Sequence, residues 1–83
     1  MKTIRYFVEQ VLRKRPYIDM VWLPEIIDRP IRRFVQSDGR VRLWGFVVDP
    51  RDGKTRVLRL VILEDCETVH NAFFDRNFQD IEP

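Results

Sequence analysis

The chain has 83 residues, of which 45% are hydrophobic and 34% charged, and its formal net charge is +2. This length and composition predict one globular domain over residues 1–83 with a modest core, and they exclude a disordered chain. The single cysteine, Cys66, excludes an internal disulfide framework and a cysteine metal site, so we expect a reducing cytoplasmic location without cofactor or metal. No segment approaches the roughly 20 apolar residues that span a membrane.

The N-terminal part of the chain predicts two helices. The first covers Phe7–Lys14, whose apolar residues fall at helical spacing, and it ends before Pro16 because the residue preceding a proline avoids the α region. Asp19 is the expected N-cap of the second helix, whose apolar stripe consists of Met20, Leu23, Ile26 and Ile27. A short additional strand could precede the first helix.

Residues 31–74 predict a four-stranded antiparallel meander. The strand-like segments IRRFVQ, VRLWGFVV, TRVLRLVIL and TVHNAFF are separated by the turn-like segments SDGR, DPRDGK and EDCE. Asp38-Gly39 is the strongest hairpin signal, since a tight hairpin turn requires positive φ. The expected fold class is therefore α+β, with both helices packed on one face of the meander.

Two-residue loops at Asp38-Gly39, Asp52-Gly53 and Asp65-Cys66 would fix the register of the whole sheet, because directly paired residues share a face. The face covered by the helices would then hold Phe34, Val41, Leu43, Val47, Leu58, Leu60, Ile62, Val69 and Phe73. The second face would hold Arg33, Arg42, Trp44, Phe46, Val48, Val57, Arg59, Val61, Leu63 and His70. Asn71 falls on the covered side, and this pairing does not explain it.

The second face suits RNA. Arginine contacts phosphates and stacks on planar groups, and Trp44 could stack on a base. His70 could act as a general acid or base, with Arg59 and Arg42 stabilising the charge of a cleaved phosphodiester. The basic residues Lys14 and Arg15 at the end of the first helix could add phosphate contacts.

The same face also suits a protein partner. Interfaces favour Trp, Phe and Arg as anchors, and an uncovered apolar sheet face invites a homodimer. A structural role remains the ordinary role for each residue alone: His70 as an exposed strand residue, Trp44 as packing, and the arginines as a solvated face. The sequence has no glycine-rich phosphate loop, metal-ligand spacing or Ser/His/Asp arrangement, which argues against most standard enzyme classes.

The order of two helices followed by a four-stranded meander resembles the small RelE/ParE-like toxins, and especially their BrnT-like branch. The resemblance lies in VLRKRPYI, the helix ending in DRP, QSDGRVRLWGFV, LRLVILED and TVHNAFFDR. It implies a metal-independent endoribonuclease that a small cognate antitoxin neutralises. The positions it carries over are Arg42, Arg59, His70 and Arg76, with Lys14 or Arg15.

The leading hypothesis is therefore a toxin-like protein that cleaves or binds RNA, with His70, Arg59 and Arg42 as the catalytic set. Arg33, Trp44, Lys14, Arg15 and Arg76 are the expected binding residues. The alternative is a non-catalytic interaction module, most simply a homodimer through an exposed Trp44 face, and a third possibility is RNA binding without cleavage. The charge of +2 is low for a protein that docks on ribosomal RNA.

Overall fold

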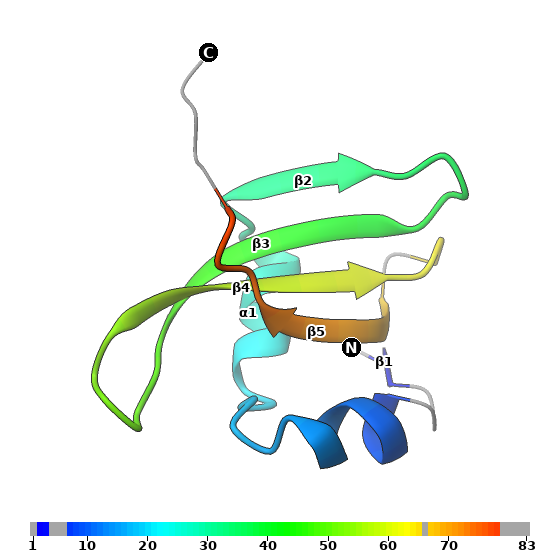
Figure 1. Ribbon diagram of the computed structural model, residues 1–83. Helices are drawn as coiled ribbons and strands as arrows, with labels where there is room; N and C mark the ends of the chain where they lie inside the picture. The colour runs from blue at the N-terminus through cyan, green and yellow to red at the C-terminus, as the bar shows by residue number, and fades with distance from the viewer. Residues whose placement is uncertain (1, 4–6, 66, 79–83) are drawn as a thin grey trace.

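The structure is a computed structural model that describes residues 2–3, 7–65 and 67–78. In chain order its elements are β1 (Lys2–Thr3), η1 (Phe7–Leu12), α1 (Trp22–Asp28), β2 (Arg32–Val35), β3 (Val41–Val48), β4 (Thr55–Ile62) and β5 (Thr68–Phe74). The strands form one sheet in the order β1-β5-β4-β3-β2 (Figure 1). Strands β2 to β5 are the antiparallel meander, and β1 joins β5 in parallel.

The prediction of two N-terminal α-helices is wrong, because the described residues form one short α-helix, α1. The segment expected to form the first helix is instead the π-helical stretch η1. The wider π turn still buries Phe7 and Val11 together, with Leu12 against the same core. The apolar spacing therefore located the buried face of this segment but did not reveal its hydrogen-bonding pattern.

Helix α1 begins later than its expected cap. Its N-cap is Val21, and the carboxylate of Asp19 accepts a hydrogen bond from the Val21 N–H at 2.9 Å in a turn before the helix. Pro24 falls in the first helical turn, where its missing N–H costs little. The helix contacts β3 so closely that a Cβ added to Gly45 would lie 2.5 Å from Cγ1 of Ile26.

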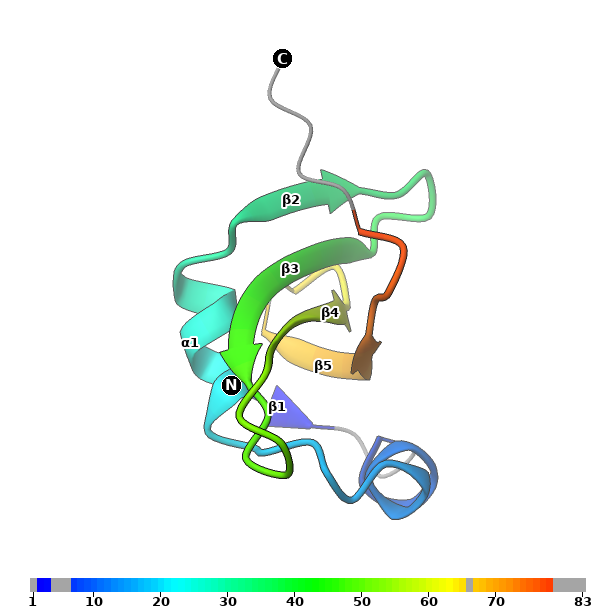
Figure 2. The same ribbon diagram turned by 60° about the vertical axis from the view of Figure 1, so that its left-hand side comes forward.

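The core lies between one face of the sheet and the two helical segments. Figure 2 shows α1 on one side of the curved sheet and the segment after β5 on the other. The largest fully buried apolar side chains are Phe7, Leu23, Leu58, Leu60 and Val69. This is the covered face, and the opposite face of the sheet is called the second face below.

The first hairpin differs from the predicted register by one residue. Gln36 N donates to Arg40 O at 2.8 Å, and Gly39 has φ of +88°, so the loop holds three residues rather than two. Phe34 consequently pairs with Arg42, and Arg33 pairs with Leu43. The prediction of Phe34 on the covered face and Arg33 on the second face is wrong, since a shift of one residue exchanges the two faces.

The second hairpin keeps the predicted faces although its loop is longer. Asp49 N donates to Lys54 O at 2.8 Å, and the ladder begins at Val48 opposite Thr55. This pairing is displaced by two residues from the one expected for a loop at Asp52-Gly53. A displacement of two residues leaves every side chain on its original face.

The third hairpin contains a β-bulge that sequence pairing did not anticipate. Ile62 pairs with Val69 as predicted, but Val61 pairs with Asn71, so His70 is the extra residue of β5. The bulge explains why Asn71 does not lie on the covered face. It also moves Phe73 to the second face, where Arg59 is its partner, so the prediction of Phe73 in the core is wrong.

The helices of the described part are all short. Among these residues, none forms a helix with the length and apolar character needed to cross a membrane.

Candidate functional site: an arginine and aromatic cleft

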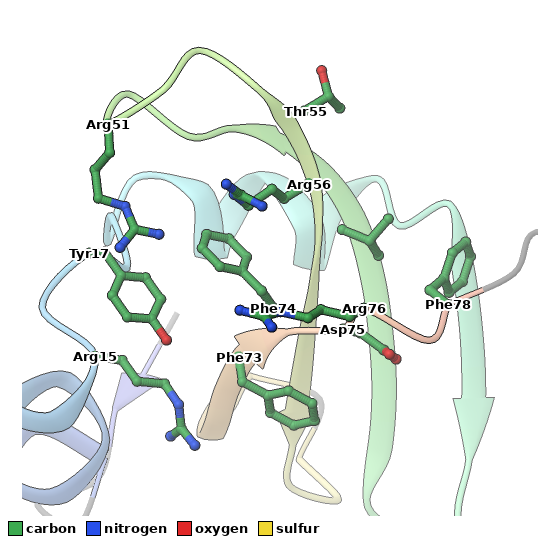
Figure 3. A pocket seen from close by; sticks show the side chains of 11 residues that line it. Arg15, Tyr17, Arg51, Thr55, Arg56, Phe73, Phe74, Asp75, Arg76 and Phe78 are labelled. Atoms are coloured by element: carbon green, nitrogen blue, oxygen red, sulfur yellow. The ribbon is translucent and has the colours of Figure 1, made fainter.

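A cleft of about 660 Å³ lies at the end of β5, where residues from three distant segments meet. Figure 3 shows Arg15 and Tyr17 on one side of it and Arg51 and Arg56 above. Across its floor and far side lie Phe73, Phe74, Asp75, Arg76 and Phe78. We call it the arginine cleft, and it is lined by Arg15, Tyr17, Arg51, Thr55, Arg56, Val57, Phe73, Phe74, Asp75, Arg76 and Phe78.

Two of the four cleft arginines are held by a buried carboxylate. Asp49, which is fully buried, accepts hydrogen bonds from Arg51 Nη2 at 2.7 Å and from Arg56 Nε at 2.9 Å. Arg56 also pairs with Asp52. The hydrogen bonds from Arg51 hold the pKa of Asp49 far below its usual range, against the opposing effect of burial, and Arg56 adds to the lowering. This network fixes the loop between β3 and β4 and the upper wall of the cleft.

Aromatic rings form the inner wall of the cleft. The Tyr17 and Phe74 rings stack with their centroids 5.2 Å apart and an interplanar angle of 22°. Arg51 lies over Tyr17 at 4.4 Å from the ring centroid, and Arg56 lies over Phe74 at 5.8 Å. These contacts orient both guanidinium groups while the Asp49 network neutralises their charge.

The other two cleft arginines carry the uncompensated charge. Within the residues that the structure describes, Arg15 and Arg76 form no ion pair. Arg15 lies over the Phe73 ring at 5.9 Å. The acidic residue of the cleft is Asp75, and its Oδ2 accepts a hydrogen bond from Trp44 Nε1 at 2.9 Å. The cleft can therefore bind an anion at Arg15 and Arg76 and a flat ring beside its aromatic wall.

Trp44 is not the exposed anchor that the sequence suggested. Its side chain is only 9% exposed, because the segment after β5 crosses the second face above it. Asp75 accepts the indole hydrogen bond, and the Phe78 ring lies 5.9 Å from the Trp44 ring. Trp44 thus anchors this segment, and the exposed aromatic residues of the second face are Phe34 and Phe46.

Arg42 and Arg59 do lie together on the second face, as predicted. The row Trp44, Arg59 and Phe73 runs across three strands, and Arg42 is one diagonal step away. Burial lowers the pKa of Arg59, and the charge of Arg42 lowers it further. The Nε atoms of both arginines are buried, and neither has a hydrogen-bond partner within the described chain.

His70 lies outside the arginine cleft. The bulge places Asn71 opposite Val61 and Phe73 opposite Arg59, so His70 is one position farther from Arg59 than regular pairing would put it. Burial lowers the pKa of His70, and the charge of Arg40 lowers it further. The imidazole is therefore mainly neutral near neutral pH, which is the form that accepts a proton.

Of the remaining predicted residues, some line the arginine cleft and others lie outside it. Arg15 and Arg76 line the cleft, whereas Lys14 is exposed at the end of the helical segment before it. Arg33 is exposed on β2 and pairs with Leu43, so it does not lie with Arg42 and Arg59 on the second face.

Sequence reasoning missed Tyr17, Arg51, Arg56 and Phe74 as residues of the site. They lie far apart in the chain, and strand alternation does not bring them together. A signal was present in DPRDGKTR, where two aspartates alternate with arginines at a turn, which is typical of a loop held by ion pairs. Comparisons with protein-family models, curated protein sequences and solved structures found no match to this chain.

Proposed function

We propose that the protein binds single-stranded RNA in the arginine cleft. The observation that carries this proposal is one cleft of about 660 Å³ in which an aromatic wall lies beside Arg15 and Arg76, two arginines that form no ion pair within the described residues. Proteins that bind single-stranded nucleic acid combine these two features, cations for the backbone and rings for the bases. The cleft volume is within the range typical of small-molecule sites, so it suits one nucleotide unit.

The choice of RNA follows from the resemblance of the meander segments QSDGRVRLWGFV, LRLVILED and TVHNAFFDR to RelE/ParE-like toxins. A direct test measures the affinity of a labelled RNA oligonucleotide by fluorescence anisotropy at low salt. The double substitution Arg15→Gln and Arg76→Gln should weaken binding at least about tenfold, since each removes a charge-assisted contact. Phe73→Leu should weaken binding by about 1–3 kcal/mol, the usual contribution of one stacked base.

The matched control is Arg29→Gln. Arg29 is an exposed arginine that pairs with Asp28 at the end of α1, outside the arginine cleft. Its substitution removes one positive charge, as each of the two cleft substitutions does singly, and should leave the affinity within about twofold. Equal losses for this control and for the cleft variants would overturn the proposal, as would the absence of RNA binding by the wild-type protein.

We also propose, from the same resemblance, that the bound RNA is cleaved without a metal ion and that a small antitoxin blocks this activity. Two observations favour cleavage: the adjacent guanidinium groups of Arg42 and Arg59, and a His70 imidazole in the neutral form. A neutral imidazole can take the proton of a 2′-hydroxyl as its oxygen attacks the phosphorus. The P–O5′ bond breaks as the cyclic phosphate forms, and the leaving 5′-oxygen takes a proton from water, while the arginines stabilise the charge that develops on the phosphate.

Cleavage has its own test. Wild-type protein in the presence of a chelator should convert RNA into fragments ending in a 2′,3′-cyclic phosphate, and His70→Ala should abolish this product without changing the affinity. Intact RNA in both reactions would reject cleavage and leave RNA binding as the function. Coexpression with the protein of the neighbouring reading frame should suppress any toxicity if that protein is the antitoxin.

A further inference from the structure

Phe73 belongs both to the arginine cleft and to the second face. Arg15, from inside the cleft, lies 5.9 Å from the Phe73 ring centroid, and Arg59, from the second face, lies 4.9 Å from it. Arg59 does not line the cleft, although it is the strand partner of Phe73. Phe73 is therefore the point at which the cleft opens onto the second face.

Beyond Phe73 lies a pair of arginines whose charge is not neutralised by an ion pair in the described part of the chain. Arg59 and Arg42 are both half-buried, and their buried Nε atoms have no hydrogen-bond partner there. The facing carboxylate is that of Asp75, which also accepts the Trp44 indole hydrogen bond, and its single negative charge favours the charged form of Arg59. Two like charges held side by side at a partly desolvated surface are unfavourable unless an anion joins them, so this pair points to an anionic ligand.

The spacing of these groups suits a chain of phosphates. Arg42 and Arg59 are diagonal neighbours across β3 and β4, which places their strand positions about 7–8 Å apart. This separation is comparable to that of successive phosphates in an extended nucleic-acid strand. The track ends at Phe34, which is 54% exposed and has the Arg42 guanidinium 5.8 Å from its ring centroid.

We propose that single-stranded RNA seated in the arginine cleft continues over Phe73 onto Arg59 and Arg42, so that the complete site spans at least three nucleotides. This inference rests on the proposed RNA binding in the cleft. It deepens that proposal by specifying an extended, unpaired strand rather than a mononucleotide or a duplex. Unpaired bases are required because the rings along the track, Phe73 and Phe34, offer flat surfaces for stacking.

Oligonucleotide length tests the inference. The wild-type protein should bind a uridine hexanucleotide at least about tenfold more tightly than a uridine dinucleotide, because only the longer strand reaches the distal arginines. The double substitution Arg42→Gln and Arg59→Gln should remove most of the gain in affinity with length. Arg33→Gln, on the neighbouring strand but the other face, is the matched control and should retain the gain.

A second measurement leaves the protein unchanged. Replacing single phosphates of the hexanucleotide by uncharged methylphosphonates should weaken wild-type binding at linkages beyond the first as well as at the cleft. A loss of affinity confined to one linkage would overturn the extended site while leaving cleft binding intact. The same conclusion would follow if the Arg42 and Arg59 double variant kept the full gain in affinity with oligonucleotide length. Tighter binding of a duplex would overturn the single-strand assignment, and no binding of either oligonucleotide would overturn both proposals.

Discussion

Asp49 shows how one buried charge organises the site. Its carboxylate is fully buried and is held by Arg51 and Arg56, which come from the loop after β3 and from β4. Removing the carboxylate would leave Arg51 without its ion-pair partner and Arg56 with Asp52 alone at the cleft wall. A buried pair that loses one member destabilises a fold more than an exposed pair does.

We expect Asp49→Asn to unfold at lower temperature and lower urea concentration than the wild type at neutral pH. The folded pKa of Asp49 is depressed, so its contribution to stability is present above the unfolded pKa of about 4 and is lost as the pH falls toward the folded pKa. The difference between the two proteins should therefore shrink in acid. Asp52→Asn, which changes an exposed partner of Arg56 in the same loop, should have the smaller effect.

His70 provides a second prediction at a single side chain. Burial and the charge of Arg40 both disfavour the imidazolium, so NMR titration of the folded protein should give a pKa below the unperturbed value of about 6.5. Stability from this group is present above about pH 6.5 and is lost as the pH falls through the folded pKa. Arg40→Gln should move the His70 pKa upward, and an unchanged titration would contradict the role of Arg40.

The strands were predictable because side chains alternate along them with a period of two residues. The alternation in β3 and β4 identified Leu43, Leu58 and Leu60 as core residues. Loop length is not encoded in this way, since a glycine with positive φ, such as Gly39, occurs in hairpin loops of two or three residues. The one additional residue in the first hairpin loop exchanged the two faces of β2.

The bulge at His70 had one signal in the sequence, the polar residue Asn71 on the predicted core side. Pairing by alternation cannot insert an extra residue, so it placed Phe73 in the core and missed its contact with Arg59. Among the cleft residues, Arg15 was predicted from its charge and from the family resemblance, and Arg76 from the resemblance. Their meeting with Tyr17 and Arg51 depends on the path of three loops, which local patterns do not specify.

The contact of α1 with β3 gives a prediction about how two elements pack. Gly45→Ala should destabilise the protein by about 1–3 kcal/mol in urea unfolding, because its Cβ would overlap the Ile26 side chain. The double variant Gly45→Ala with Ile26→Ala should recover part of the stability lost by Ile26→Ala alone. Strictly additive losses in this double-mutant cycle would show that the two positions do not compete for the same space.

For the molecule as a whole, the net charge of +2 is small, but the cleft and the second face hold four arginines that form no ion pair within the described residues. We expect RNA affinity to fall with salt, with a slope of about −0.7 in log–log form for each phosphate neutralised. Engagement of Arg15, Arg76, Arg59 and Arg42 gives a slope of roughly −3. Each Gln substitution among them should reduce its magnitude by about 0.7, whereas Arg29→Gln should leave it unchanged.

The parallel pairing of β1 with β5 has a consequence for how the chain folds during synthesis. Lys2 pairs with Thr68 and Thr3 with Val69, so the partner of the first strand is the last one made. The hairpins of β2, β3 and β4 can form as they leave the ribosome, because their contacts are local. The sheet edge beside β5 closes only after residue 69 has emerged, so β1 has no strand partner until the whole meander has been made.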